Sequence, residues 1–279
     1  MATIIANQGI TLDWSATATW KGAVVPVSGD TVVFEEGGVY VFTAGLNQSA
    51  VNLAALVALN CFLSIAGQLQ IDVNNSGRGL MLALRGGDFR MSGATNVVSV
   101  ERPTAQVSLE GGAHALIVAV NGGPVVVGSA ATCEDIKVFR RGVVRAESHA
   151  TDRIKVDIGS GGICETRRNV EAGNIGHGRL ELIDGARITD GSTGGQVDLR
   201  DARAELRIRA NQALTHRRIN ALAGVVDATR STGIQTYTND VETPDSMFLD
   251  ESVGGRVVRS GTTRYGFAGS AITRAQGVE

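Results

Sequence analysis

The sequence predicts a nearly all-β protein in which short strands stack into an elongated parallel solenoid, and its composition supports this in three ways. Glycine is abundant at 36 of 279 residues, proline is scarce at 4, and aromatic residues make up only 4%. Hydrophobic residues nevertheless reach 43%, and most are aliphatic, which excludes low-complexity disorder. Many glycines among small aliphatic residues suit tight turns between short strands around a narrow interior.

The charge balance gives no reason to expect a polyanionic partner. The formal net charge is −2 and the isoelectric point is near 6.1, so no global field draws the chain to nucleic acid or an anionic membrane. No apolar run approaches the ~20 residues that span a bilayer. Residues 1–5 lack the basic and long apolar regions of a secretory signal. We therefore expect no nucleic-acid partner, no membrane partner and synthesis in a cytoplasm.

The three cysteines, Cys61, Cys133 and Cys164, are odd in number and far apart in the sequence. None stands in a CxxC or Cys/His spacing that would indicate a metal site. Each lies among apolar or small residues, so we expect three reduced, largely buried thiols made in a reducing compartment.

Strand-like alternation dominates the chain, and helical periodicity is almost absent. Only residues 50–63 fit an amphipathic helix, and their alternation at period two fits a strand nearly as well, which the neighbouring segments favour. Elsewhere short alternating runs start mostly 7–11 residues apart, with Gly-Gly, Asp-Gly or Asn-Gly pairs between many of them. The expected strands include Thr31–Phe34, Val39–Phe42, Leu69–Val73, Leu80–Leu84, Asp88–Met91, Asn96–Val100, Gln106–Leu109, Ala115–Val120, Val125–Val127, Ile136–Phe139, Val143–Ala146, Ile154–Ile158, Arg179–Ile183, Arg187–Thr189, Gln196–Leu199 and Glu205–Ile208.

Two architectures produce such spacing: an antiparallel sandwich or barrel, and a parallel β-helix with two or three short strands per coil. Residues 179–210 favour the β-helix, because a strand–turn–strand pattern recurs there about 17 residues on. We therefore predict a single-stranded, right-handed parallel β-helix. In it Leu180 with Leu182, and Val197 with Leu199, would point inward in successive coils. The residues expected to face water between them are Arg179, Glu181, Asp198 and Arg200.

The predicted organisation has three parts. Residues 1–35 form an N-terminal cap and the first strands, and residues 36–235 form the β-helix. Residues 236–279 are more polar, and only Val257-Val258 looks like strand. We expect this last part to be a C-terminal extension or cap that covers the solenoid end or reaches a neighbouring subunit.

A motif near the N-terminus adds a family resemblance. Trp20, Gly22, Pro26, Gly29, Asp30 and Val32 stand where the W-x-G-x-x-P-x-x-G-D-x-V opening of many β-helical surface and virion proteins, including G8-type modules, has its marked residues. One extra residue precedes Pro26. Residues 51–67 resemble a segment of bacteriophage structural proteins. The two stretches cover a minor part of the chain, and the resemblance implies a β-helix of a virion or surface protein and no activity.

Trp14 and Trp20 are the only tryptophans and lie six residues apart. Two such rings could form a platform on which a sugar ring stacks. Few aromatic residues elsewhere could continue a binding groove, however. We therefore expect the pair to fill the N-terminal cap.

Acidic residues come in pairs that suggest polysaccharide chemistry, because glycoside hydrolysis needs two carboxylates about 5–9.5 Å apart across a cleft. Glycines or arginines stand beside most of these acids, as they do in solvated turns and charge ladders, so structural roles are favoured. A lyase would need a calcium-binding carboxylate cluster that faces a basic residue, and no distinctive version is present. The pairs are Glu134-Asp135, Asp184 with Asp190, and Asp198 with Asp201.

Histidines, glycine pairs and arginine pairs also lack a catalytic context. No histidine has metalloprotease spacing, and no Ser or Cys stands in a nucleophile elbow. A phosphate-binding glycine loop must open a helix, so the glycine pairs are expected to be turns. The arginine pairs lack interleaved aromatic residues, and salt bridges to a partner subunit are favoured over nucleic-acid binding. These residues are His114, His149, His177 and His216; Gly86-Gly87, Gly111-Gly112, Gly122-Gly123, Gly161-Gly162 and Gly194-Gly195; and Arg140-Arg141, Arg167-Arg168 and Arg217-Arg218.

From these observations we expect no catalytic residue, no cofactor and no metal site. Together with the resemblance, they predict a non-enzymatic structural protein of a tailed-phage virion that decorates the capsid. Apolar strips on flat β-faces would join copies of the chain, with a trimer preferred, and attach them to the major capsid protein or other virion proteins. The alternatives are a tail spike or fibre, a β-helical polysaccharide lyase or hydrolase, a polysaccharide-binding protein and a bacterial surface adhesin.

Overall fold

The computed structural model describes most of the chain. Residues outside the description are 76–77, 102–105, 123, 191–194, 229, 232, 234, 239–240, 243–245, 251–256, 261–263, 266–271 and 275–279. From residue 236 onward only the backbone of the strands is described.

The protein is essentially all β, and its parallel strands stack as a β-solenoid, which confirms the predicted fold class. The one helical element among the described residues is a single turn of 3-10 helix, η1 (Thr17–Thr19). The chain divides into two compact units. Unit 1 comprises Met1–Glu134 and Gly142–Arg145, and unit 2 comprises Asp135–Arg141 and Ala146–Glu279.

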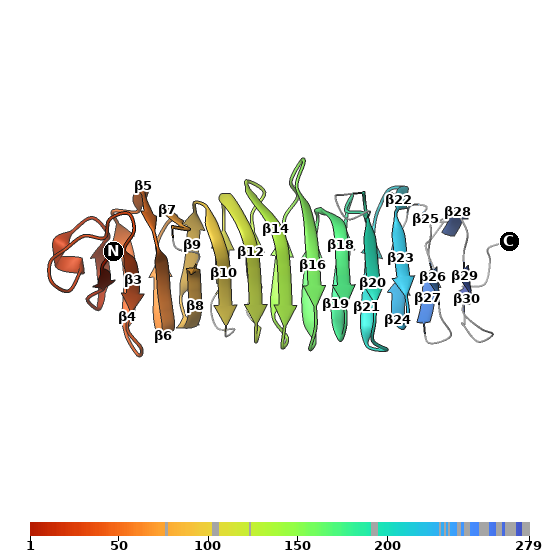
Figure 1. Ribbon diagram of the computed structural model, residues 1–279, viewed down its shortest axis with the longest axis horizontal. Coiled ribbons are helices and arrows are strands. Elements are labelled where there is room, and N and C mark those ends of the chain that lie inside the picture. The colour runs from red at the N-terminus through yellow and green to blue at the C-terminus, as the bar shows by residue number, and fades with distance from the viewer. Residues whose placement is uncertain are drawn as a thin grey trace. The chain divides into compact units, whose positions relative to one another are not determined.

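Unit 1 contains the first coils, whose strands lie side by side in Figure 1. The residues that lead from one strand to the next are mostly glycine and short polar side chains, which suit the turns between coils. Its strands are β1 (Thr3–Ile5), β2 (Gly9–Asp13), β3 (Thr31–Phe34), β4 (Val39–Ala44), β5 (Asn47–Leu53), β6 (Ala55–Ile65), β7 (Leu69–Val73), β8 (Gly79–Gly86), β9 (Asp88–Ser92), β10 (Thr95–Glu101), β11 (Gln106–Leu109), β12 (Gly112–Val120) and β13 (Pro124–Val127). The boundary with unit 2 falls within β14 (Ala131–Phe139) and β15 (Val143–Ala146).

Unit 2 repeats the same construction. Its strands are β16 (Arg153–Ile158), β17 (Gly162–Thr166), β18 (Asn169–Ile175), β19 (Gly178–Ile183), β20 (Gln196–Leu199), β21 (Ala204–Arg209), β22 (Leu214–His216), β23 (Arg218–Ala221), β24 (Gly224–Asp227), β25 (Gln235–Thr238), β26 (Val241–Glu242), β27 (Ser246–Asp250), β28 (Val257–Ser260), β29 (Arg264–Tyr265) and β30 (Ile272–Arg274).

Each coil supplies one strand to each of two sheets. In unit 1 the first sheet contains β3, the start of β6, β8, β10 and β12, and the second contains β9, β11 and β13. In unit 2 the first sheet contains β14, β16, β18, β20 and β23, and the second contains β17, β19, β21 and β24. We call the side on which a first-sheet strand turns into a second-sheet strand the turn edge. Some coils also contain a third strand. These third strands are β5 and β7 in unit 1 and β22, β25 and β28 in unit 2.

Coil length varies while strand register is kept. Gly162 pairs with Gly178 in the next coil, and Gly178 pairs in turn with Ala204, so the second of these coils is clearly longer than the first. The extra residues of long coils lie in the connections between strands, so the stacked strands keep their alignment.

Inward side chains form buried apolar rows along each unit. In unit 1, one row of paired positions is fully buried and consists of Val32, Leu56, Leu80, Val98 and Ile117. Side chains alternate at period two along a strand, so every second residue points into the interior, as the sequence indicated.

The predicted register of residues 179–210 is partly wrong. Leu180, Leu182, Val197 and Leu199 are all buried, as expected. They do not stack on one another, because β19 and β20 belong to different sheets. Leu180 pairs with Leu206 in the second sheet, and Val197 pairs with Ile219 in the first. The strand–turn–strand repeat in this part of the sequence therefore links the two sides of the solenoid rather than two successive coils.

The other strand predictions can be compared directly with the structure. Residues 50–63 lie in β5 and β6, so the strand alternative is confirmed over the helix. All predicted runs lie within observed strands except Arg187–Thr189, where Ile188 makes only an isolated bridge to Val170. Parallel pairing continues past residue 235 through β26–β30, so no change in pairing marks the expected start of the C-terminal extension.

Candidate functional site

The N-terminal end of unit 1 is filled by an aromatic cluster. Trp14 and Trp20 are buried, with ring centroids 4.9 Å apart in an edge-to-face arrangement, and Trp20 Nε1 donates to the Trp14 carbonyl oxygen at 2.9 Å. Phe34 and Phe42 pack against the Trp14 ring. Since neither indole face reaches solvent, the tryptophans cannot stack on a sugar, and they fill the end of the solenoid.

The residues of the N-terminal motif build the turn that follows this cluster. Asp30 is buried, and its carboxylate accepts hydrogen bonds from the backbone N–H of Ala2 at 2.7 Å and of Val27 at 3.1 Å. Pro26 and Val32 are buried, while Gly29 has a φ of +87° that favours glycine. These contacts give the motif a structural role: it links residues near Met1 to the first coil.

The outer side of the first sheet in unit 1 is mostly apolar, although Ser99 and Glu101 of β10 stand in the same outward rows. Val57 pairs with Met81, and Leu59 pairs with Ala83 in the same two strands. Leu59 is 44% exposed and Met81 is 38% exposed. Leu116 and Val118 continue the same side on β12, where both are half-buried. We call Val57, Leu59, Met81, Leu116 and Val118 the apolar face.

The outer side of the corresponding sheet in unit 2 is polar and charged. One row of paired positions runs through β14, β16, β18, β20 and β23, and it alternates cation, anion and amide. We call this row the polar face; it consists of Lys137, Asp157, Asn174, Asp198 and Asn220.

Asp198 is the most strongly held member of the polar face. Its carboxylate accepts hydrogen bonds from Gln196 Nε2 at 2.5 Å, Asn220 Nδ2 at 2.7 Å and an Arg200 guanidinium nitrogen at 2.8 Å. Burial raises the pKa of Asp198, but the bonds from Arg200, Asn220 and Gln196 outweigh it and hold the pKa below its ordinary value. Asp198 therefore stays ionised, which does not suit a general acid.

The other predicted carboxylates have structural partners or stand apart. Asp184 lies in a turn at φ +58° and accepts a bond from Arg167 Nε at 2.8 Å, and Asp190 pairs with Arg217. Asp201 accepts bonds from Arg203, which lower its pKa. Glu134 is exposed and Asp135 is half-buried on β14, between the buried Cys133 and Ile136.

Glu181 and Asp198 do not face water as the sequence analysis predicted. Glu181 is only 2% exposed, and Asp198 only 9%. On the second sheet the Glu181 carboxylate lies 2.7 Å from Arg209 Nε, and longer arginine side chains cover it. Alternation placed both acids on the outer side correctly but could not show how far their neighbours cover them.

Two of the four histidines are buried, which the sequence did not indicate. His114 lies between the Thr95 hydroxyl, 2.7 Å from Nδ1, and the Gly111 carbonyl, 3.1 Å from Nε2. His216 lies 2.9 Å from the Gln235 amide oxygen, and burial lowers its pKa to about 4. Both rings are held by hydrogen bonds inside the protein, so they are structural.

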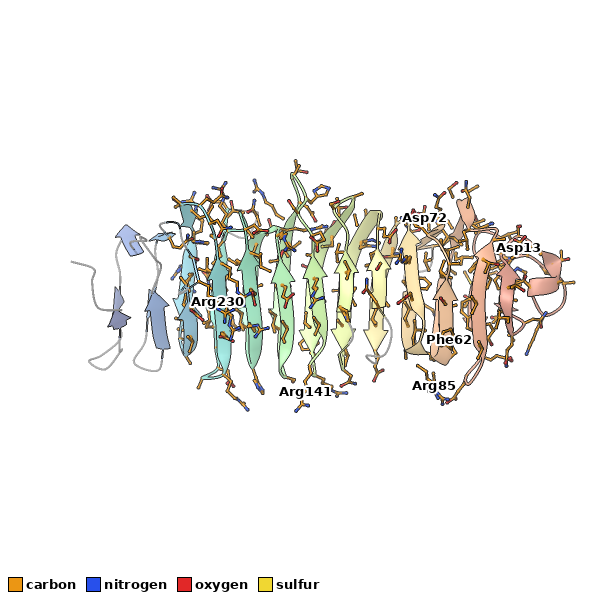
Figure 2. The ribbon with its side chains drawn as sticks, turned by 180° about the vertical axis from the view of Figure 1, so that it is seen from behind. Asp13, Phe62, Asp72, Arg85, Arg141 and Arg230 are labelled. Carbon is orange, nitrogen blue, oxygen red and sulfur yellow. The ribbon has the colours of Figure 1, made fainter. Side chains whose placement is uncertain are left out.

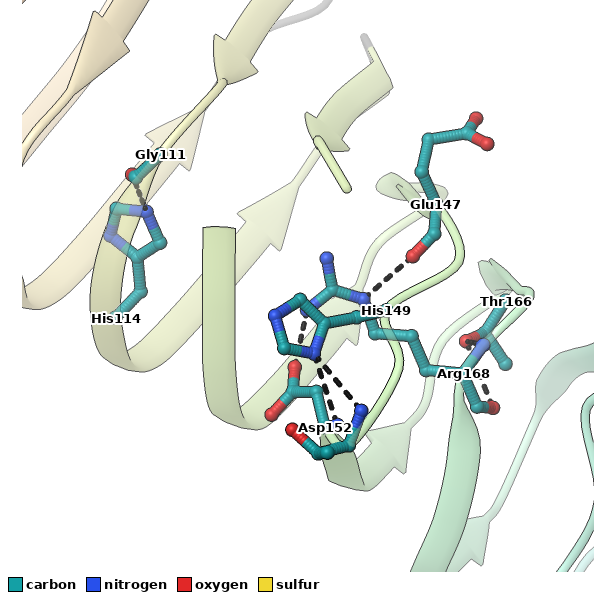
Figure 3. A network of polar contacts seen from close by, with 8 residues as sticks. Gly111, His114, Glu147, His149, Asp152, Thr166 and Arg168 are labelled. Atoms are coloured by element: carbon teal, nitrogen blue, oxygen red, sulfur yellow. Dashed lines mark hydrogen bonds and ion pairs between the residues drawn. The ribbon is translucent and has the colours of Figure 1, made fainter. Parts of the chain in front are cut away.

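The side chain of Arg168, a member of one predicted arginine pair, is fully buried, whereas the sequence analysis favoured a salt bridge to a partner subunit for it. It pairs with Asp152 and donates from Nε to the Glu147 carbonyl at 2.8 Å, while Thr166 Oγ1 accepts from its backbone N–H (Figure 3). His149 Nδ1 accepts from the Asp152 N–H in the same loop. The network ties the β15–β16 loop to the β17–β18 turn.

The remaining predictions concern glycine pairs and thiols. Gly87, Gly122 and Gly161 lie between strands at positive φ, as predicted for turns, and no α-helix follows them in the described chain. The other described members of these pairs include strand ends: Gly86 ends β8, Gly112 begins β12 and Gly162 begins β17. Gly123 and Gly194 lie outside the described residues. All three cysteines are buried thiols that form no disulfide, as predicted. Burial raises the pKa of the Cys61 thiol to about 11.

Within the residues that the structure describes, no group of three or more His, Cys, Asp or Glu side chains could hold a metal ion. A helix of the length and apolarity needed to cross a membrane is not found in that part of the chain either. A shallow hollow in unit 2 is lined by Asp184, Gly185, Asn211 and Gln212.

Comparison with known proteins gives no family assignment. No protein-family model matches the chain, and neither a curated protein nor a solved structure matches it.

Proposed function

We propose that the protein is a structural component of a virion, of the kind that decorates the capsid of a tailed phage. It would act by adhesion, joining copies of itself, with a trimer preferred, and attaching them to the major capsid protein or another virion protein. The observation that carries the proposal is the apolar face of unit 1, where Leu59 and Met81 are exposed on a regular sheet. Contiguous exposed apolar residues on a stable scaffold mark interaction surfaces.

Two further features support this proposal. The N-terminal motif resembles the opening of β-helical virion proteins, and its residues Trp20 and Asp30 hold the end of the solenoid in place. The three thiols are buried and reduced, which suits a protein made in a reducing compartment and then assembled.

The decisive experiment removes the apolar face without touching the core. The double substitution Leu59→Ser with Met81→Ser should leave the melting temperature nearly unchanged, because both side chains point outward. It should abolish self-association in sedimentation and binding to particles that lack the protein. The matched control is Lys137→Ser with Asp157→Ser on the polar face of unit 2. Equal association by the apolar-face variant and the wild type would reject the proposal.

A second candidate function rests on the polar face of unit 2. A row of amides and carboxylates along parallel strands offers hydrogen bonds at a regular spacing of about 4.8 Å, and a polysaccharide could bind along it. Asp157→Ala with Asn174→Ala, which changes the half-buried and the exposed member of the row rather than the buried Asp198 and Asn220, should then weaken retention on a polysaccharide affinity column, while the apolar-face variant should not.

Catalysis on such a ligand is not expected. Asp184 and Asp190 are each paired with an arginine, Arg167 and Arg217 respectively. Purified protein should leave capsular and cell-wall polysaccharides at full length, as measured by size-exclusion chromatography. Shortening that is lost on Asp184→Asn or Asp190→Asn would replace the structural proposal with an enzymatic one.

A further inference from the structure

The turn at Arg140 and Arg141 uses residues poorly suited to its backbone conformation. Both arginines have positive φ values, 48° and 63°. The equivalent turns in neighbouring coils use Asn121-Gly122 and Ser160-Gly161, again with positive φ at both positions. Asparagine and glycine adopt this left-handed conformation readily, whereas the Cβ of an arginine clashes with the backbone there. The arginine pair therefore lowers the stability of a turn that a neighbouring coil builds with Asn-Gly.

The same two side chains carry unmatched positive charge. Arg140 and Arg141 are exposed, and no carboxylate among the described residues pairs with either one. Other arginines on this turn edge of unit 2 are neutralised locally. Arg200 pairs with Asp198 at 2.8 Å and Arg203 with Asp201 at 3.2 Å. Figure 2 shows Arg141 projecting from the edge of the sheets.

Residues held in unfavourable backbone conformations, such as non-glycine residues at positive φ, occur preferentially at functional sites. A strained turn that displays two unpaired guanidinium groups therefore indicates a contact site for an anionic partner. Guanidinium groups bind carboxylates through paired hydrogen bonds, so an acidic protein surface fits this turn well.

The chain itself carries such an acidic surface on unit 1. Glu36, Asp88 and Glu101 lie where first-sheet strands end or second-sheet strands begin, and all three are exposed. The basic residues among the described part of this edge are Arg85 and Lys21, of which Lys21 is paired with Glu35. Among its described residues, the turn edge of unit 1 therefore carries more acidic than basic side chains, whereas that of unit 2 carries the excess positive charge of Arg140 and Arg141.

We propose that the Arg140–Arg141 turn of one copy binds the acidic turn edge of unit 1, formed by Glu36, Asp88 and Glu101, in a second copy of this chain. Two different surfaces meet in this contact, so it is heterologous, and repetition around a symmetry axis closes a ring such as the trimer. This inference rests on the self-association in the proposed function and adds the contact that sets subunit order.

The test replaces the strained turn with its relaxed equivalent. The double substitution Arg140→Asn with Arg141→Gly should raise the melting temperature by about 2–4 °C, because Asn-Gly suits the left-handed turn. The same variant should weaken self-association by about tenfold in sedimentation at low salt, because two ion-pairing groups are lost. Ser160→Asn is the matched control, since it relaxes the next turn without changing charge and should leave self-association unchanged.

A charge exchange tests the identity of the partner surface. Asp88→Arg alone should weaken self-association, and Arg141→Asp should do the same. The two variants combined in one chain should restore association, because each copy then offers the reversed pair to its neighbour. Failure of the combined variant to recover would reject the contact between these two edges.

The remaining outcomes also decide the question. If Arg140→Asn with Arg141→Gly self-associates like the wild type but loses retention on a heparin column, the partner is a polyanion and the inference is overturned. If the apolar-face variant becomes monomeric while the turn variant associates normally, only this inference fails and the proposed function stands. If the wild type is monomeric and binds no particles, the proposed function fails as well.

Discussion

The first sheet has the same construction in both units, yet its outer side differs between them. In unit 1 it exposes Leu59 and Met81, and in unit 2 it presents Asp157 and Asp198 at outward positions. The inner sides do not differ, since both consist of buried aliphatic rows. The comparison shows that the buried inward rows and the turns are enough to form a coil. The outward residues can therefore differ between the units and serve different functions.

The different outer sides also imply different energetics. Apolar side chains on the outside of unit 1 gain free energy only when a partner covers them, at roughly 25 cal/mol for each Å² removed from water. Polar side chains in unit 2 already satisfy one another, as the three hydrogen bonds to Asp198 show. Unit 1 is therefore the unit that gains from association through its sheet.

The largest expected effect would test whether the interiors of the two units are alike. Leu82→Asp in unit 1 and Leu182→Asp in unit 2 each place a charge in a buried row and should cost more than about 4 kcal/mol. Neither variant should yield soluble folded protein by circular dichroism. Met81→Asp, one position from Leu82, should fold normally. A normal melting curve for either core variant would show that its register is wrong.

A smaller loss is expected where coils approach most closely. In unit 2 a Cβ at Gly178 would lie 2.4 Å from Ile158 Cγ2 and 2.6 Å from the Gly162 carbonyl oxygen. Gly178→Ala should therefore lower the free energy of unfolding by about 2–4 kcal/mol in urea titrations. The control is Gly176→Ala, where the nearest atom would lie at 3.5 Å.

Another close approach between coils, at the start of the first-sheet strand β12 in unit 1, sharpens this comparison. A Cβ at Gly112 would lie 2.1 Å from the Gly93 carbonyl oxygen, and Gly112 also has a positive φ of 82°. Gly112→Ala should be at least as destabilising as Gly178→Ala. A milder effect would mean that the unit 1 coils can move apart more easily.

Acid should destabilise unit 2 through His216. The folded pKa of about 4 lies below the usual value of 6.5, so the unfolded chain binds a proton that the folded chain excludes. Stability should be complete above pH 6.5 and should fall by up to about 3 kcal/mol as the pH drops to 4. His216→Gln should remove this part of the pH dependence in thermal melts. An unchanged pH profile for that variant would place the titration elsewhere.

The smallest effects concern the two outer sides themselves. Asp198→Ala leaves Gln196, Arg200 and Asn220 without an acceptor and should cost about 1–2 kcal/mol. Met81→Ala should change stability by less than about 0.5 kcal/mol, because its side chain makes its contacts at the surface. Equal losses for the two variants in urea titrations would remove the energetic contrast between the units.

Much of the fold could be predicted because one signal repeats along the chain. Alternation at period two marked the strands and the inward residues, and residues 50–63 were assigned correctly because their neighbours alternate in the same way. Pairing between distant strands is not contained in that signal. Leu180 and Val197 look like successive coils in the sequence, although they belong to opposite sheets, because the length of a coil is not constant along the chain.

The candidate sites were harder to predict for a related reason. Burial of Arg168 depends on the β15–β16 loop, earlier in the chain, which supplies Asp152 and the Glu147 carbonyl. The strain at Arg140 and Arg141 depends on φ angles that an Arg-Arg sequence does not indicate. A turn signal was visible only in the neighbouring Asn-Gly and Ser-Gly pairs, and comparison of equivalent turns could have identified it.

The aromatic cluster at the N-terminal end has a consequence for synthesis of the chain. Its members all precede β5, so the cluster can form soon after this first segment leaves the ribosome; they are Trp14, Trp20, Phe34, Tyr40 and Phe42. Every later coil pairs with the coil before it, and each newly emerged strand therefore finds a completed edge as its template. We expect folding to proceed in the direction of translation, with the aromatic cluster as its starting point.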